Sequence, residues 1–244
     1  MDANKILPEI SVVIPAFNEA RRLPKTLKAI HNYFSSKNYS YEIIVVDDGS
    51  CDNTLEKVAN LNLPNIKILS YKSNRGKGYA VNFGVRAARG KYIIFIDADN
   101  STPFEQIEKL IPYLHDFEVV IGSRYLKGSN IKLKQPLVRR LVARLGNLLI
   151  QILVLPGISD TQCGFKMFRK SAARQIFSRQ TIWRWGFDIE ILLISRKLGY
   201  KIKEVPIDWY NDEGTKIQSP MVFLTTLGEL LRIKINSLKK IYKR

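Results

Sequence analysis

Two aspartates, Asp97 and Asp99, stand two residues apart directly after the apolar run 92–96. Carboxylates held this close repel each other, which favours protonation unless a cation offsets the repulsion. Mg²⁺ or Mn²⁺ is a suitable partner, because these ions prefer oxygen ligands and bridge carboxylates to phosphates. The alternative is a pair of turn-forming, helix-capping acids before Pro103. The position after a strand favours a metal site.

A second acidic pair and a basic segment have the chemistry to hold a nucleotide. Asp47 and Asp48 precede a glycine that is typical of a turn, but either carboxylate could also accept hydrogen bonds from a base or a ribose. Arg75 and Lys77 alternate with two glycines at the start of a predicted helix, where free amides and the helix dipole favour phosphate. The Gly-Lys-Ser/Thr order of a Walker loop is missing here.

Apolar β-branched runs alternate with amphipathic stretches in the first half of the chain. Strands are predicted at 10–14, 41–46, 66–69, 92–96 and 117–121, and helices at 23–34, 53–59, 77–88 and 104–114. Strands that are apolar throughout are buried on both faces, which predicts an α/β fold with a mostly parallel sheet flanked by helices. Ligands bind beyond the carboxyl ends of such strands, where the acidic and basic residues above are expected to converge.

The composition indicates an anionic partner. The 244 residues include 39 Lys and Arg against 22 Asp and Glu, for a net charge of +17. Such an excess suits nucleic acid, an anionic membrane surface or a phosphorylated substrate. No recognition helix or stacking platform is evident, so nucleic acid is not an expected partner.

Two basic amphipathic stretches, a helix at about 136–155 and the C-terminal segment 221–244, are typical of interfacial helices on an anionic membrane. The alternative is two core-facing helices with solvated cations. The apolar run 145–158 contains Asn147, Gln151 and Pro156 and is too short to span a bilayer of about 30 Å. We expect neither a signal peptide nor a disulfide framework, which favours a cytosolic setting.

Several motifs, in order and spacing, resemble the catalytic domain of glycosyltransferase family 2, which has the GT-A fold. They are Val-Ile-Pro-Ala-Phe-Asn-Glu (13–19), Val-Val-Asp-Asp-Gly-Ser (45–50), Asn-Arg-Gly-Lys-Gly (74–78), Asp-Ala-Asp (97–99) and Gly-Ser-Arg (122–124). Segments 160–166, 184–190 and 213–216 are similar to the dolichyl-phosphate β-glucosyltransferase group, with dolichyl-phosphate mannose synthase a near relative. The resemblance covers roughly residues 9–235.

The resemblance implies a Rossmann-like GT-A domain over 1–220, which includes the helix at about 136–155, followed by the amphipathic helix 221–244. It also implies inverting transfer of a hexose to polyprenyl or dolichyl phosphate, with Mg²⁺ or Mn²⁺, on the cytosolic face of a membrane. Glucose from the nucleotide-sugar UDP-glucose is the expected donor, and mannose from GDP-mannose is the alternative. Ser101 stands where mannose-type relatives have a metal-binding glutamine, which favours the glucosyl interpretation.

Roles for individual residues follow from the resemblance. Candidate catalytic residues are Asp97, Asp99 and Arg124, with Asp99 as the metal ligand. Candidate nucleotide-sugar-binding residues are Pro15, Ala16, Glu19, Asp47, Asp48, Arg75, Lys77, Asp97 and Lys216. Candidate ligands of the acceptor phosphate are Arg124, Arg139, Arg140 and Arg144. Candidate sugar-binding residues are Trp185, Asp188 and Glu190, although Asp188 and Glu190 also fit buried helix acids paired with a base.

Two rival functions are disfavoured by particular residues. A sugar-phosphate nucleotidyltransferase needs a glycine-rich basic signature after its first strand, where this chain has Pro15-Ala16-Phe17-Asn18-Glu19. A catalytically silent binding module has no need of Asp97, Asp99 and Arg124 together.

Overall fold

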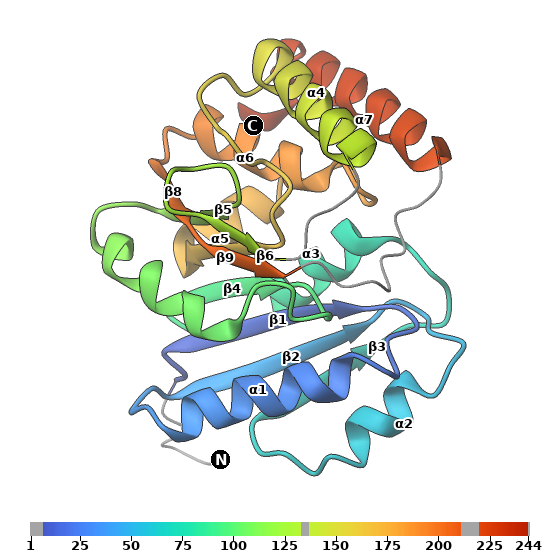
Figure 1. Cartoon of the computed structure of the whole chain (residues 1–244), viewed down its shortest axis with the longest axis vertical. Helices are drawn as coiled ribbons and strands as arrows, with labels where there is room; N and C mark the ends of the chain where they lie inside the picture. The colour runs from blue at the N-terminus through green and yellow to red at the C-terminus, as the bar shows by residue number, and fades with distance from the viewer. Residues whose placement is uncertain (1–6, 133–136, 211–219, 244) are drawn as a thin grey trace.

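The structure, a computed structural model, describes residues 7–132, 137–210 and 220–243, with side chains throughout these ranges except at 137–143, 145 and 220–224. A seven-stranded sheet in the order β3-β2-β1-β4-β7-β5-β8 crosses the middle of the molecule (Figure 1). Its strands are β1 (Ile10–Ala16), β2 (Tyr41–Asp47), β3 (Ile66–Ser70), β4 (Tyr92–Ile96), β5 (Val119–Ser123), β7 (Phe165–Arg169) and β8 (Ile202–Pro206). Only β7 runs antiparallel to its neighbours, β4 and β5, so the predicted mostly parallel sheet is confirmed.

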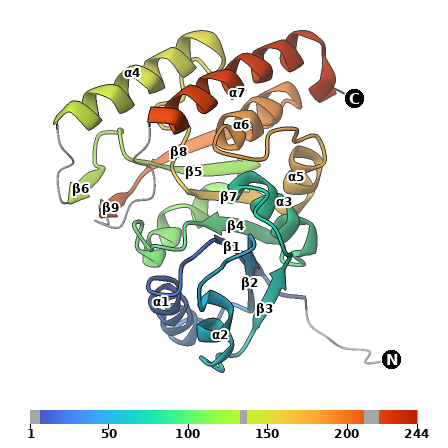
Figure 2. The same ribbon diagram turned by 90° about the vertical axis from the view of Figure 1, so that its right-hand side faces the viewer.

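Helices cover both faces of the sheet. One hydrophobic cluster joins it to α1 (Leu23–Ser35), α2 (Thr54–Ala59) and two 3₁₀ helices, η1 (Phe104–Lys109) and η2 (Ile111–His115). The other joins it to α3 (Lys77–Ala87), α5 (Lys170–Phe177) and α6 (Phe187–Lys197), on the opposite side from α1 (Figure 2). In β1, Val13 packs into one cluster, whereas Val12 and Ile14 pack into the other. The strands are apolar on both faces because both faces are covered.

Two local expectations were wrong. The segment 104–114 does not form one α-helix but the two short 3₁₀ helices, because Pro112 has no N–H to donate back to Glu108 and its ring opposes a continuous helix. The run 66–69 is not buried on both faces: as the edge strand β3 it leaves Lys67 and Ile68 exposed. Strands β7 and β8 and helices α5 and α6 were not predicted. A two-stranded sheet of β6 (Asn130–Lys132) and β9 (Asp208–Tyr210) was also missed.

The two basic amphipathic segments form α4 (Leu137–Leu153) and α7 (Pro220–Leu238), which is followed by η3 (Ile241–Lys243). They lie side by side at the β8 end of the molecule in both views (Figures 1 and 2). Leu230 and Ile233 of α7 pack into the same cluster as α3 and α5, and Lys234 Nζ donates to the Leu153 carbonyl at 2.6 Å. Among the residues described, none of the helices combines the length and apolarity needed to cross a bilayer.

Candidate active site

Asp97 and Asp99 follow β4 at the carboxyl edge of the sheet. Asp97 Oδ1 lies 2.6 Å from the Nζ of Lys77, the first residue of α3. The negative charge of Asp99 has a more distant counter-ion, because Arg22 Nη1 is 3.9 Å from its Oδ2. The Ser101 N–H donates to its Oδ1 at 2.9 Å. Burial and the charge of Asp97 raise the pKa of Asp99 above its usual value. Asp97 therefore has a close counter-ion, whereas the nearest cation described for Asp99 is more distant.

The two carboxylates fit a divalent cation with oxygen ligands. They are accessible, with 39% of the Asp97 side chain and 24% of the Asp99 side chain exposed. Within the described residues, no set of three or more Asp, Glu, His or Cys side chains is grouped to hold a metal by itself. An ion bound here would take its remaining ligands from water and from a phosphate-bearing substrate, as Mg²⁺ commonly does.

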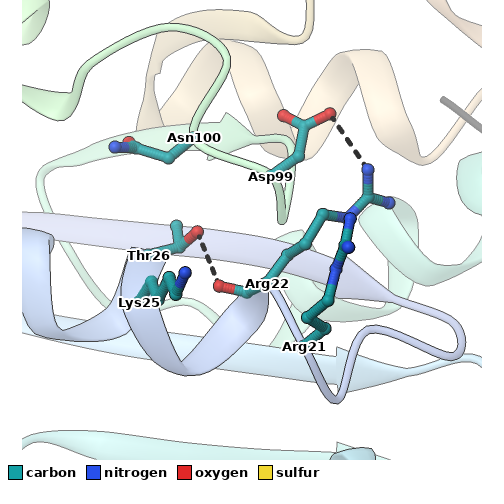
Figure 3. Close-up of a pocket in the computed structure, with 6 residues that line it drawn as sticks. All are labelled: Arg21, Arg22, Lys25, Thr26, Asp99 and Asn100. Carbon is teal, nitrogen blue, oxygen red and sulfur yellow. Dashed lines mark hydrogen bonds and ion pairs between the residues drawn. The ribbon is translucent and has the colours of Figure 1, made fainter. Parts of the chain in front are cut away.

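A cavity of about 470 Å³ opens beside Asp99. It is lined by Arg21, Arg22, Lys25, Thr26, Asp99 and Asn100 (Figure 3). The Thr26 hydroxyl donates to the Ala98 carbonyl at 2.7 Å, which ties α1 to the turn that carries the acid pair. Three cations around one cavity favour an anionic ligand next to Asp99. Sequence reasoning did not single out these cations; their signal is the cluster of Arg21, Arg22 and Lys25 that follows the loop after the first strand.

Glu19, predicted to hold the nucleoside, makes a two-point ion pair with Arg22. The Nε and Nη2 atoms of Arg22 donate to the two carboxylate oxygens at 2.7 and 2.6 Å. Glu19 is 8% exposed, so the pair is partly desolvated and holds the guanidinium at the edge of the cavity. Pro15 and Ala16 end β1 next to it, and Ala16 lies in register with Asp47 of β2.

The adjacent acids Asp47 and Asp48 have different surroundings. Asp48 accepts hydrogen bonds from the Tyr71 hydroxyl at 2.8 Å and from the backbone N–H groups of Arg75 and Gly76 at 2.7 and 2.9 Å. Its carboxylate thus organises the loop before α3. Asp47 is 2% exposed, and its Oδ1 is buried with no hydrogen-bond partner among the described residues. Asp47 is therefore the acid with an acceptor atom left for a ligand at the edge of the sheet.

Arg75 and Lys77 point to different neighbours. The Arg75 guanidinium stacks 4.8 Å from the ring centre of Tyr79 and donates to the hydroxyl of that residue at 2.6 Å. Lys77 contacts Asp97, and its Nζ lies 6.0 Å from the ring centre of Trp185. Lys77 thus faces the acid pair, whereas Arg75 lies on the aromatic outer surface of α3.

Arg124, directly after β5, is bound to Asp160 at three points. Its backbone N–H, Nε and Nη2 donate to the Asp160 carboxylate at 2.9, 2.7 and 2.9 Å. Asp160 is 1% exposed. Burial opposes the charge of both groups, but the pairing outweighs it, so the pKa of Arg124 is raised and that of Asp160 is lowered. Within the described contacts, Nη1 is the guanidinium nitrogen that Asp160 does not bind.

The remaining predicted anion ligands are placed only in part. Arg139 and Arg140 lie in α4, but their side chains are outside the described part of the chain. Arg144 is exposed on the same helix. Lys216 lies outside the described residues. Their assigned roles stay predictions.

Of the candidate sugar-binding residues, Trp185 is partly exposed, whereas Asp188 and Glu190 are buried in α6. Asp188 pairs with the fully buried Lys166 at 2.5 Å. Glu190 accepts hydrogen bonds from the Thr181 and Ile182 backbone and from the Tyr242 hydroxyl. Asp188 is thus a buried helix acid paired with a base, whereas Glu190 is held by backbone N–H groups and hydroxyls. The sugar-binding role of all three residues stays a prediction.

Comparisons with known proteins identify the family of the chain. The family model described as glycosyl transferase family 2 matches residues 11–177. A dolichyl-phosphate β-glucosyltransferase of Dictyostelium discoideum is 36% identical, over 96% of this chain and 76% of the relative. A second protein of that name from Trichomonas vaginalis is 40% identical, over 93% of this chain and 73% of the relative.

Among solved structures, glucosyl-3-phosphoglycerate synthase of Mycobacterium tuberculosis, in complex with Mn²⁺, UDP-glucose and phosphoglyceric acid, superposes with a TM-score of 0.67. It is 20% identical, with 97% of this chain and 80% of that chain covered, so this likeness supports the fold. The family match spans the acid pair, Asp47, Lys77 and Arg124. The rim of acidic and basic residues at the carboxyl ends of the strands, together with these matches, assigns the chain to glycosyltransferase family 2, with the GT-A fold.

Proposed function

We propose that the chain transfers glucose from UDP-glucose to dolichyl phosphate or a similar polyprenyl phosphate, with inversion at the anomeric carbon. The observation that carries the proposal is the match to dolichyl-phosphate β-glucosyltransferases over 93–96% of the chain. The site supports it with an acid pair suited to a divalent ion and with cations on both sides of that pair.

The chain's own residues divide the substrates between two sides of the acid pair. Asp47 Oδ1 is an acceptor for an N–H or hydroxyl of the nucleoside, and Lys77 is a cation for the diphosphate. Arg124 Nη1 is a donor for the acceptor phosphate. Asp97 and Asp99 would hold Mg²⁺ or Mn²⁺, which when bound neutralises charge on the diphosphate leaving group.

The acceptor itself supplies the nucleophile. A phosphate monoester has a second pKa of about 6 and is mostly dianionic at neutral pH, so no general base is needed. One of its oxygens forms the bond to the anomeric carbon as the bond to the diphosphate oxygen breaks, and the electron pair leaves with UDP. The cations on both sides of the reaction centre hold two anions close together, which is the main task of the enzyme.

Donor identity is tested by thermal unfolding with UDP-glucose, UDP-N-acetylglucosamine and GDP-mannose, each with Mn²⁺. We expect UDP-glucose at about a hundred times its Kd to raise the melting temperature by roughly 5 °C or more. Asp47→Ala should lose most of that shift, because the buried acceptor Oδ1 is removed. Asp116→Ala, at an acid whose side chain is 72% exposed, is the matched control. If GDP-mannose alone stabilised the protein, the proposed reaction would have to be mannosyl transfer and not glucosyl transfer.

The face formed by α4 and α7 supports docking on an anionic membrane surface, from the cytosolic side. We call it the α4–α7 face. Its exposed apolar residues are Leu148, Leu149, Ile152 and Leu153 on α4, and Leu227, Leu231, Ile235, Leu238 and Ile241 on α7 and η3. No Asp or Glu occurs between 119 and 159 or after Glu229. Exposed leucines flanked by cations are suited to bury in a bilayer surface while the charges meet lipid phosphates.

Leu231→Glu is expected to weaken binding to vesicles of phosphatidylserine and phosphatidylcholine by about tenfold or more. The leucine that would insert into the lipid is replaced by a charge that anionic lipid repels. Leu231 is 57% exposed, so the fold should tolerate the change. Ile68→Glu, on the edge strand β3 at the other end of the sheet, is the matched control. Co-sedimentation measures binding, and a short, detergent-soluble acceptor should be used equally well by both variants. Equal vesicle binding by both variants would contradict docking through the α4–α7 face.

A further inference from the structure

The ammonium group of Lys77 already occupies one carboxylate of the acid pair. Nζ lies 2.6 Å from Asp97 Oδ1, and the Lys77 side chain is 17% exposed. Burial disfavours the charge of Lys77, but Asp97, Asp188 and Asp99 together outweigh it and raise the pKa of the ammonium. The rings of Trp185 and Phe187 lie within 6.0 Å of Nζ and wall the group in. Lys77 is therefore a charged, held counter-ion and not a solvated surface lysine.

One side of the Asp97 carboxylate packs against backbone. A Cβ placed on Gly164 would lie 2.1 Å from Asp97 Oδ2, and the Asp97 N–H donates to the Gly164 carbonyl at 3.2 Å. Asp97 thus sits between the Gly164 backbone and Lys77. An incoming cation that uses Asp97 must share the carboxylate with the ammonium or displace it.

Asp99 by itself offers little to a divalent ion. Its Oδ1 accepts the Ser101 N–H, and within the described residues no third acidic, histidine or cysteine side chain completes a metal cluster. Nor can Lys77 move to another free acid, because Asp188, the next carboxylate that influences it, is buried against Lys166 at 2.5 Å. A donor diphosphate is the anion that can both complete the metal's ligands and receive the ammonium.

We propose that Lys77 is an internal counter-ion that competes with the divalent ion for Asp97, so that metal binds tightly only together with the nucleotide diphosphate. This inference rests on the proposed function, because it takes UDP-sugar as the donor and Asp97 and Asp99 as the metal site. In the donor-free protein Lys77 neutralises Asp97. When metal and diphosphate bind together, the ion takes over Asp97 and the ammonium turns to a phosphate oxygen. The two ligands are then coupled, each raising the affinity for the other by the same factor.

The test measures Mn²⁺ affinity by electron paramagnetic resonance of the free ion, with and without UDP. For Lys77→Met without UDP, we expect Mn²⁺ to bind about tenfold or more tightly than to the wild type, because a contacting cation shifts the equilibria of a carboxylate by that order. The factor by which UDP improves Mn²⁺ affinity should fall correspondingly. Lys77→Arg keeps a cation at the position and should behave like the wild type.

Lys25→Met is the matched control, because Lys25 lines the cavity beside Asp99 but forms no ion pair within the described residues. Loss of that charge should change donor-free Mn²⁺ affinity by less than about threefold, as expected for a screened, non-contacting charge. The melting temperatures of all variants establish that they are folded. Equal or weaker donor-free Mn²⁺ binding by folded Lys77→Met overturns the counter-ion role and leaves the proposed function standing. Failure of the wild type to bind Mn²⁺ even with UDP overturns the metal-dependent function itself, and the inference with it.

Discussion

Asp99→Asn is expected to lower metal-dependent transfer by about a thousandfold or more. Neutralisation of a diphosphate leaving group by a bound ion contributes several kcal/mol to the transition state, and about 4 kcal/mol corresponds to that factor. Asparagine keeps the shape of the side chain and removes the charge that would hold the ion. Sugar transfer to a short polyprenyl phosphate, measured with Mn²⁺ and with excess EDTA, checks the expectation. Full activity of the variant, or of the wild type in EDTA, would contradict a metal role for Asp99.

The same substitution should not destabilise the fold. The pKa of Asp99 is raised by burial and by Asp97, so the native state binds this proton more tightly than the unfolded state does. The contribution of such a group to the free energy of unfolding falls as pH rises above the ordinary value of 3.8 towards the raised one. At neutral pH and without metal, the melting temperature of Asp99→Asn should therefore equal or exceed that of the wild type. Asp116→Asn, at an exposed acid, should change neither activity nor its pH profile.

Arg124→Ala is expected to reduce the free energy of unfolding by about 3–5 kcal/mol, because Asp160 would stay buried without its partner. In a chain of this length that corresponds to a fall in melting temperature of roughly 6–20 °C. Lys37→Ala, which removes a solvent-exposed ion pair with Glu108, is the control and should leave the melting temperature nearly unchanged. A stable Arg124→Ala variant would mean that solvent reaches Asp160 freely.

The double variant Arg124→Met, Asp160→Leu separates folding from chemistry. Without a stranded charge its stability should return close to that of the wild type. It still lacks the guanidinium, so acceptor-dependent turnover should remain about ten- to a hundredfold low, while UDP binding is unchanged. Recovery of both stability and turnover would mean that Arg124 serves the fold alone and does not bind the acceptor phosphate.

Much of the fold was predictable because its signals are local. Each of the first five strands is a short, mostly apolar run, and the acid pair stands directly after one of them. The strand β7 was missed for a physical reason. Lys166 in the middle of its pattern is fully buried, and the strand tolerates that cation because the Cys163 carbonyl and Asp188 of α6, 22 residues away, accept hydrogen bonds from it. Pro112, by contrast, was a local signal for the break between η1 and η2 that the helical spacing of 104–114 obscured.

The roles within the rim depended on partners that lie far apart in the chain. Asp47 and Asp48 are identical side chains next to each other, but Asp48 is bound to a loop 26–28 residues away, whereas Asp47 keeps an acceptor atom with no partner in the part of the chain that the structure describes. Arg124 was expected to be available for a phosphate, but two of its three guanidinium nitrogens are bound by Asp160.

The amino-acid sequence by itself therefore determined the class of fold, the acidic and basic rim at the strand ends and the kind of chemistry available there. These depend on the periodicity of apolar residues and on the residues that end each strand. Only the tertiary structure decided which charges are already paired, as Lys77 is with Asp97 and Arg124 is with Asp160. The physical reason is that the state of a buried charge depends on its desolvation and on a partner brought close by folding, and neither is encoded in the residues beside it.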